Sequence, residues 1–289
     1  YIRVKGLKIL KIAIVTDSTA YIPEDLLEKY NIHTVPLSVV FGEESFRESI
    51  DITTEEFYRK VKESKKLPST SQPAIGTYIE LFEDLARTHD AVISIHLSKR
   101  FSGTYDAAKS AGTMVKDIEV FPYDSALSAM PQGFYAIAAA EMVQEGKNVE
   151  EIINQLNIMK NKTRAYFMVD DLSHLQRGGR LNSAQAILGS LLNIKPILHI
   201  VDGLIVPFEK IRTRKKAINR IMNMLEEDAN TKKIVRVVFI HANNESTAIK
   251  LRESFAEKHP EVESIISYFG PVIGTHLGEG SIGVSWYTE

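Results

Sequence analysis

The chain of 289 residues contains no cysteine. This absence excludes disulfide bonds, thiolate nucleophiles, zinc sites with cysteine ligands and iron–sulfur clusters. The sequence also lacks the H-E-x-x-H pattern of zinc-dependent hydrolases. We therefore expect neither a metal ion nor a cofactor in the functional site.

Long apolar segments and an excess of one charge are also missing. No apolar run approaches the ~20 residues that a membrane-spanning helix needs. The 35 basic and 37 acidic side chains give a net charge of −2, so no broad positive surface attracts nucleic acid or anionic lipid. Residues 1–11 contain no long apolar stretch and no small-residue cleavage site, so we expect no secretion signal and a cytoplasmic location.

Nucleotide-binding and hydrolase signatures are absent, apart from one accidental match. Residues 278–283 fit the dinucleotide pattern G-x-G-x-x-G, but only six residues follow them. This is too few for the helix and the acidic residue that the motif requires. The sequence has no phosphate-binding P-loop and no G-x-S-x-G turn. We therefore expect the chain to have no ATPase or kinase activity of its own.

The first half of the chain alternates between β-rich and helical segments. Thr53 and Glu56 form the capping-box pattern that begins one of these helices. Strands separated by helices are typical of βαβ units, so this half predicts a mostly parallel sheet with flanking helices. The expected strands are 11–16, 33–41, 90–97 and 118–123, and the expected helices are 23–30, 53–64, 75–89, 103–114 and 131–144.

The second half contains a hairpin signal among its helices. Asp202 and Gly203 separate two β-rich runs, which predicts a tight antiparallel turn. The expected strands are 165–169, 197–201, 204–208, 234–241, 262–269 and 282–287, and the expected helices are 183–192, 215–228 and 246–259. The sequence thus predicts an α/β fold with an N-terminal α/β domain at 7–155 and, at 156–289, an α+β domain with a mixed or antiparallel sheet.

Polar residues follow the first expected strand and precede the third expected helix. Asp17 and Ser18 end the strand, where they either line a ligand site or cap the next helix. Two prolines enclose the segment 69–72, which contains Thr70 and Ser71. This rigid loop either directs hydroxyl and N–H groups at an anion or forms a turn with a helix cap.

A similar turn joins the expected strand 90–97 to the helix after it. Gly103 lets a ligand approach the backbone closely, and Ser102 and Thr104 place hydroxyl groups at the helix N-terminus. We interpret two such hydroxyl-rich turns in one domain as a candidate anion site, with simple helix capping as the alternative.

Two segments of the second half are rich in glycine. Arg177 and Arg180 enclose a Gly-Gly pair, which indicates either a functional loop or a solvated surface loop. Residues 270–280, including Gly274, are expected to form a loop that packs its backbone closely. His276 in this segment is either a structural histidine or a polar contact to a ligand.

Six motifs in this chain occur in an order that resembles the DegV family. They are Thr16–Ser18, Ser69–Pro73, Ser102–Thr104, Leu175–Arg180, Lys195–Leu198 and Gly270–His276. The resemblance implies two α/β domains that hold a long-chain fatty acid between them. It also implies a bacterial carrier in phospholipid metabolism rather than an enzyme: the binding subunit of a fatty acid kinase, which presents the carboxylate to a separate kinase that makes the acyl phosphate.

The same resemblance implies roles for individual residues. Thr70 and Ser102 are expected to hydrogen-bond the fatty acid carboxylate, and His276 to lie close to it. No residue is expected to be catalytic. The residues expected to support the carboxylate site are Asp17, Ser18, Ser71, Gly103, Thr104, Arg177, Arg180 and Gly274.

The energetics of burial agree with a fatty acid ligand. Burying ~15 methylene groups stabilises a complex by roughly 12 kcal/mol, against an association cost of about 4–15 kcal/mol. Hydroxyl groups and a histidine can then offset the desolvation of the carboxylate, whereas a phosphorylated ligand would favour lysine and arginine. We expect the preferred chain length to depend on the far end of the tunnel, with Ile187, Leu188, Leu191 and Leu192 as candidates.

Two other functional classes remain open at this point. An acyl hydrolase or transferase would use Ser102 as its nucleophile and His276 as its base, and sequence order does not exclude that pairing. A module that binds only proteins would carry no acyl chain. For the carrier, the basic residues near the hydroxyl and Gly-Gly turns are expected to meet an acidic surface of the kinase: Lys99, Arg100, Arg177 and Arg180.

Overall fold

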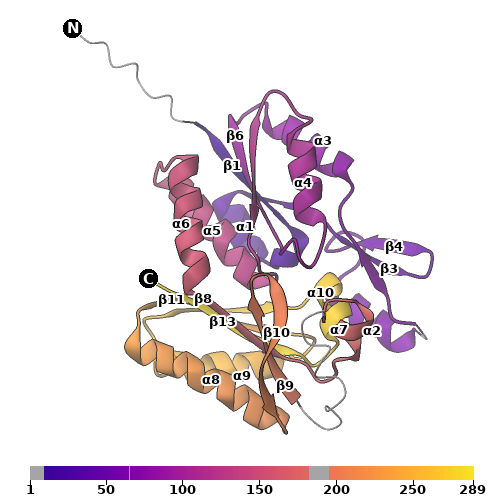
Figure 1. Cartoon of the computed structure of the whole chain (residues 1–289), viewed down its shortest axis with the longest axis vertical. Coiled ribbons are helices and arrows are strands. Elements are labelled where there is room, and N and C mark those ends of the chain that lie inside the picture. The colour runs from indigo at the N-terminus through magenta and orange to yellow at the C-terminus, as the bar shows by residue number, and fades with distance from the viewer. Residues whose placement is uncertain (1–9, 65, 182–194) are drawn as a thin grey trace.

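The structure is a computed structural model that describes residues 10–64, 66–181 and 195–289. It contains three β-sheets with helices packed around them (Figure 1). The helix expected at 183–192 lies outside the described residues, and so do the four candidate tunnel-end residues, Ile187, Leu188, Leu191 and Leu192.

The N-terminal half is built on a parallel sheet, as the sequence predicts. Its strands run in the order β2 (Ile32–Val35), β1 (Ile12–Asp17), β6 (Ala91–His96) and β7 (Glu119–Asp124). Every residue of β1 and β6 is buried, because helices cover both faces of the sheet. On one face lie α3 (Ile75–Leu85) and α4 (Thr104–Gly112), and on the other α1 (Glu24–Tyr30) and α5 (Met130–Gln144), with α6 (Val149–Lys162) against α5 (Figure 1).

The second half is built on a six-stranded mixed sheet. Its order is β10 (Leu204–Ile211), β9 (Lys195–Val201), β8 (Thr163–Met168), β13 (Ile282–Thr288), β11 (Ile234–His241) and β12 (Glu263–Tyr268). Only β11 and β12 pair in parallel. The helices α8 (Arg214–Thr231) and α9 (Glu245–Ala256) cover one face, and α5 and α6 meet the other (Figure 1). The predicted fold class, a parallel sheet followed by a mixed one, is confirmed.

The structure also contains a three-stranded sheet that the sequence does not predict. It consists of β4 (Glu44–Arg47), β3 (Ser38–Phe41) and β5 (Ser69–Ser71), all antiparallel, and it lies beside α2 (Thr54–Glu63). The strand expected at 33–41 is wrong as a single element. Pro36 interrupts it, because proline fixes φ and donates no hydrogen bond, and the two pieces join different sheets.

The expectation of a loop at 270–280 is also wrong, because the segment contains the helix α10 (Pro271–Leu277). Gly270 occupies the N-cap position and Pro271 the first helical turn, where proline needs no N–H partner. Gly278 ends the helix with a φ of 77°. Two further short elements are η1 (Ser18–Ala20) and α7 (Ser173–Arg177).

Two local predictions are confirmed in detail. The Thr53 side chain accepts a hydrogen bond from the Glu56 backbone N–H, and the Glu56 carboxylate accepts one from Thr53 N at 2.9 Å, which completes the capping box. Asp202 and Gly203 both have positive φ and join β9 to β10. The predicted domain boundary between residues 155 and 156 falls inside α6, and the division into 7–155 and 156–289 stays a prediction.

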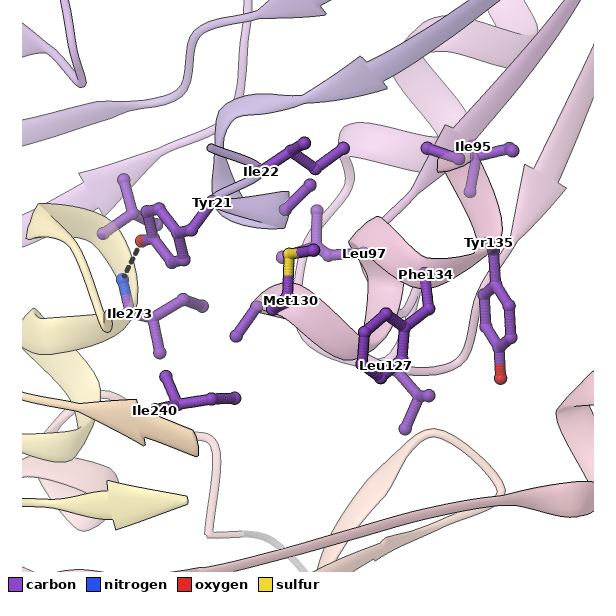
Figure 2. Close-up of a cluster of buried hydrophobic side chains, with 14 of the residues drawn as sticks. Tyr21, Ile22, Ile95, Leu97, Leu127, Met130, Phe134, Tyr135, Ile240 and Ile273 are labelled. Atoms are coloured by element: carbon purple, nitrogen blue, oxygen red, sulfur yellow. Dashed lines mark hydrogen bonds between the residues drawn. The ribbon is translucent and has the colours of Figure 1, made fainter. Parts of the chain in front are cut away.

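Buried side chains join the two halves into one core. Figure 2 shows Met130 of α5 on the side of Ile240 of β11 and Ile273 of α10, with Phe134 of the same helix beside Leu127. An ion pair adds to this contact, since Arg236 of β11 donates to the Glu141 carboxylate of α5 at 2.7 Å. Among the described helices, none has the length and apolar character needed to cross a bilayer.

Candidate ligand-binding site

A cavity of about 330 Å³ lies between the two large sheets. Its volume falls within the range of about 300–1,000 Å³ that is typical of small-molecule sites. The segments after three of the four parallel strands, β2, β6 and β7, contribute to it, which is where α/β sheets usually bind ligands. Its main apolar lining residues are Leu37, Leu97, Ala129 and Pro131 from the N-terminal half, with Ala165, Phe167, Ile200, Ile205, Ile240 and Val284 from the six-stranded sheet.

Polar residues from three distant segments also line the cavity. Thr70 lies on β5, Ser102 lies in the turn between β6 and α4, and His276 lies in the last turn of α10. The structure thus brings the three predicted carboxylate contacts to one cavity, and their role as ligands stays a prediction. Three of the expected supporting residues line the cavity as well: Ser71, Gly103 and Arg180.

The two hydroxyl turns are held together by backbone pairing and by a glycine. Thr70 pairs with Val39 of β3, which fixes β5 beside the cavity. A Cβ atom at Gly103 would lie 2.1 Å from Oε1 of Gln72, so the Gln72 side chain, one residue after β5, packs closely against the turn before α4. The sequence order of these segments gives no sign of this contact.

His276 is a buried, neutral imidazole bonded to a hydroxyl. Its Nε2 lies 3.0 Å from Thr70 Oγ1. Burial, together with the nearby Arg180 and His174, lowers the pKa of His276 from 6.5 to about 4. Its Nδ1 has no hydrogen-bond partner among the described residues, and a Cβ at Gly178 would lie only 2.2 Å from that atom.

The Ser102 hydroxyl is engaged at the start of α4. Its Oγ lies 2.9 Å from Thr104 Oγ1 and accepts a weak hydrogen bond from Thr104 N at 3.4 Å. No hydrogen bond joins Ser102 to His276 in the part of the chain that the structure describes. The nucleophile–base contact that a serine hydrolase needs is therefore not formed here.

The two arginines of the Gly-Gly segment have different environments. Arg180 is half-buried, and its Nε donates to the Phe101 carbonyl at 3.0 Å, so it links this segment to the Ser102 turn. Its Nη1 donates to the Gly178 carbonyl. Arg177 is exposed and lies outside the cavity lining.

The other expected supporting residues lie outside the cavity lining, and their supporting role stays a prediction. Asp17 accepts from Leu97 N at 3.0 Å and caps η1 through Thr19 N at 3.1 Å, so the capping interpretation describes it. Ser18 lies one residue further on, and its hydroxyl donates to the Glu48 carboxylate. Gly274 lets α10 approach α2, since a Cβ there would lie 2.6 Å from Tyr58 Oη.

Asp17 also belongs to a buried Ser–His–Asp chain. His96 Nδ1 lies 3.0 Å from Asp17 Oδ2, and His96 Nε2 lies 2.7 Å from Ser94 Oγ. All three residues are 0% exposed, and none of them lines the cavity. Because all three side chains are buried away from the cavity, these hydrogen bonds connect β1 to β6 and do not reach a ligand there.

Sequence reasoning misses the sheet side of the cavity and one buried acid. Phe167 and Ile240 come from strands whose apolar pattern predicts burial but not a ligand. Gly283 pairs with Phe167 on the neighbouring strand and also lines the cavity. Glu48 is fully buried, although nothing in the charged segment around it distinguishes it from a surface acid.

Comparison with known proteins gives one consistent match. The family model described as "uncharacterised protein, DegV family" matches residues 11–289. The protein DegV of Bacillus subtilis (strain 168) is 55% identical over 278 residues, which cover 96% of this chain and 99% of that protein.

Solved structures agree with this match. The crystal structure of DegV from Bacillus subtilis, described as a fatty acid binding protein, has a TM-score of 0.93 at 55% identity, covering 97% of this chain and 100% of that one. A fatty-acid-binding DegV family protein from Thermus thermophilus has a TM-score of 0.91 at 31% identity, with coverage of 97% and 100%. This chain therefore belongs to the DegV family.

Proposed function

We propose that the chain binds a long-chain fatty acid, with the acyl chain in the cavity and the carboxylate at Thr70 and Ser102. The observation that carries this proposal is the make-up of the site: a largely apolar cavity between two sheets whose lining includes a hydroxyl–imidazole pair. The fatty acid ligands named for the Bacillus and Thermus relatives support the same assignment.

The state of His276 explains how a neutral site can hold a carboxylate. Because its pKa is about 4, the imidazole carries a single N–H at neutral pH. Placing that hydrogen on Nδ1 would leave a buried N–H without an acceptor, which native structures rarely tolerate. We infer that Nε2–H donates to Thr70 Oγ1, so that the Thr70 hydroxyl hydrogen is free to donate to the ligand.

The charges around the cavity favour a carboxylate over a phosphate ester. Arg180 is the only lysine or arginine among the described lining residues. Its bonds to backbone carbonyls use part of its donor capacity. One partly engaged cation suits a single negative charge, whereas a phosphate with about two charges recruits several cations.

Mass spectrometry of the purified protein tests this function. A carrier that encloses its ligand is expected to retain acyl chains through purification, so a denatured sample should release close to one fatty acid per chain. Added deuterated palmitate should then exchange into the protein. Protein that releases no fatty acid and takes up none would contradict the proposal and favour a module that binds only proteins.

We further propose that the chain presents the carboxylate to a separate kinase that forms the acyl phosphate. The Ser102 turn follows the carboxyl end of the parallel strand β6, and exposed basic side chains lie close to it in the sequence. Lys99 and Arg100 lie beside Ser102, and Arg177 lies in the Gly-Gly segment. Such charges mainly increase the rate of encounter with an acidic partner, and salt screens them.

Reversing Arg177 to glutamate is expected to slow acyl-phosphate formation in an assay with both proteins, while the affinity for the fatty acid stays unchanged. The wild-type rate should fall as salt rises, and the variant's rate should depend less on salt. Lys147→Glu is a matched control. Lys147 is exposed and follows the C-terminal end of α5, whereas the N-terminal end of that helix lies at the cavity. If Arg177→Glu and Lys99→Glu both behave like this control, the docking surface lies elsewhere.

A further inference from the structure

Glu48 is a buried carboxylate whose hydrogen bonds reach both halves of the chain. It follows β4 and is 0% exposed. Its Oε2 accepts from Ser18 Oγ at 2.5 Å. Its Oε1 accepts from Tyr21 Oη at 2.7 Å and from Val272 N at 2.8 Å. Three donors therefore compensate the burial of this acid, which makes it a fixed point between the N-terminal half and α10.

The bond to Val272 caps α10 from a distant part of the sequence. Gly270 at the N-cap has no side chain that could accept from the first N–H groups of the helix. Val272 N donates instead to Glu48, and Ile273 N donates to Tyr21 Oη at 3.1 Å (Figure 2). The approach is close, since a Cβ at Gly270 would lie 2.4 Å from the Tyr21 ring.

The capped end of α10 is directly connected to the carboxylate site. His276 lies four residues after Val272, so the two residues share one face of the helix. The helix has only seven residues, and a shift of its N-terminus would move the imidazole away from Thr70. Glu48 itself does not line the cavity, so it makes no contact with an acyl chain there.

We propose that Glu48 is a positioning residue for the carboxylate site, which holds α10 so that His276 Nε2 meets Thr70 Oγ1. The proposal rests on the proposed fatty acid function and adds a residue outside the cavity to it. Glu48 acts by accepting hydrogen bonds. A neutral oxygen in the same place is therefore expected to hold α10 as well.

Binding of palmitate and of methyl palmitate separates this role from a general effect on the fold. Both ligands have the same acyl chain, but the ester offers no carboxylate to Thr70 and Ser102. Glu48→Ala is expected to weaken palmitate binding about tenfold while methyl palmitate binding changes little, because a hydrogen bond to a charged group is lost. In Glu48→Gln the amide oxygen can accept from Val272 N, so its affinity should stay within about threefold of wild type.

Glu141→Ala is the matched control for Glu48→Ala. Glu141 also joins the two halves through a partly buried bond, in this case to Arg236. Arg236 pairs with Glu263, the first residue of β12. The helix α10 follows the opposite end of that strand, so the Glu141 bond lies away from α10. The control is expected to leave the ratio of palmitate to methyl palmitate affinity unchanged. Equal losses for both ligands in Glu48→Ala, or the same change of ratio in the control, would overturn the positioning role.

The imidazole ¹⁵N spectrum of His276 gives a second readout. Wild-type protein and Glu48→Gln should show one protonated and one unprotonated ring nitrogen, and Glu48→Ala should show averaged tautomers. If Glu48→Ala does not fold, Tyr21→Phe removes one donor to Glu48 and the acceptor of Ile273 N, and should change ratio and spectrum in the same direction. An unchanged spectrum would overturn the proposal. If wild-type protein binds neither ligand, the proposed function is wrong, and the spectrum still tests the Glu48 contact.

Discussion

Replacing Thr70 with valine is expected to lower the affinity for a long-chain fatty acid by roughly tenfold to a hundredfold. Valine has nearly the same shape as threonine but donates no hydrogen bond, and a bond to a charged acceptor contributes about 1.5–3 kcal/mol. The substitution also leaves His276 Nε2 without its partner. Ser102→Ala should have a similar effect, because it removes the second hydroxyl at the same end of the cavity.

Displacement of a fluorescent fatty acid, measured by titration, gives these affinities. Ser69→Ala is the control, since Ser69 lies on β5 one residue before Thr70 but is exposed and does not line the cavity. Circular dichroism and thermal melting establish that each variant is folded. Wild-type affinity in folded Thr70→Val and Ser102→Ala would show that the carboxylate binds elsewhere.

The second large effect is expected in the pH dependence of stability. The pKa of His276 falls from its ordinary value of 6.5 to about 4, because the buried ring resists protonation. The contribution of neutral His276 to the free energy of unfolding is therefore fully present above pH 6.5. About 3 kcal/mol of it is lost as the pH falls towards 4. The pH dependence that Glu48 contributes has the opposite sign. Burial raises the pKa of Glu48 from 4.5 to about 7, so its ionisation lowers the free energy of unfolding as the pH rises through that interval.

These two contributions oppose each other between about pH 4.5 and 6.5 in the wild-type protein. Glu48→Gln removes one of them, so its free energy of unfolding should fall more steeply than wild type on acidification. His276→Asn removes the other, so its stability should fall as the pH rises from 4.5 to 7. Other groups that influence the Glu48 pKa are Ser18, Val272, Tyr21 and Asp17, and Glu48 in turn raises the pKa of Tyr21, Tyr58 and Tyr268.

Urea unfolding at a series of pH values measures the difference between each variant and the wild type. The difference curves isolate the two groups, since all other titrating side chains are shared. Difference curves that stay flat from pH 4 to 7 would show that neither buried group titrates as described.

Local sequence patterns predict the two large sheets because they depend on neighbouring residues. The capping box at Thr53 and the turn at Asp202 and Gly203 each specify a conformation within a few residues. The third sheet and α10 have no such local signal, so the sequence does not predict them. β5 has three residues, which is too short for a periodic pattern, and α10 lacks a side-chain cap at Gly270.

The candidate site could be predicted only in part. Thr70, Ser102 and His276 belong to motifs that resemble one family, so their approach to one cavity could be expected from that resemblance. Glu48 could not, because its burial results from contacts with segments far away in the sequence. The apolar sheet side of the cavity was hidden too, since a residue such as Phe167 has the same pattern in a solid core.

The cap of α10 has a consequence for the order of folding. Glu48 and Val272 are 224 residues apart, so their bond closes one of the longest loops in the chain. Contacts of this kind form late, because the entropy of loop closure must be overcome before they contribute. The parallel sheet and the hairpin can assemble from nearby segments, whereas α10 gains its cap only once both halves have met. The proposed carboxylate site at the end of α10 is thus expected to mature only after the two halves have met, together with the cavity between them.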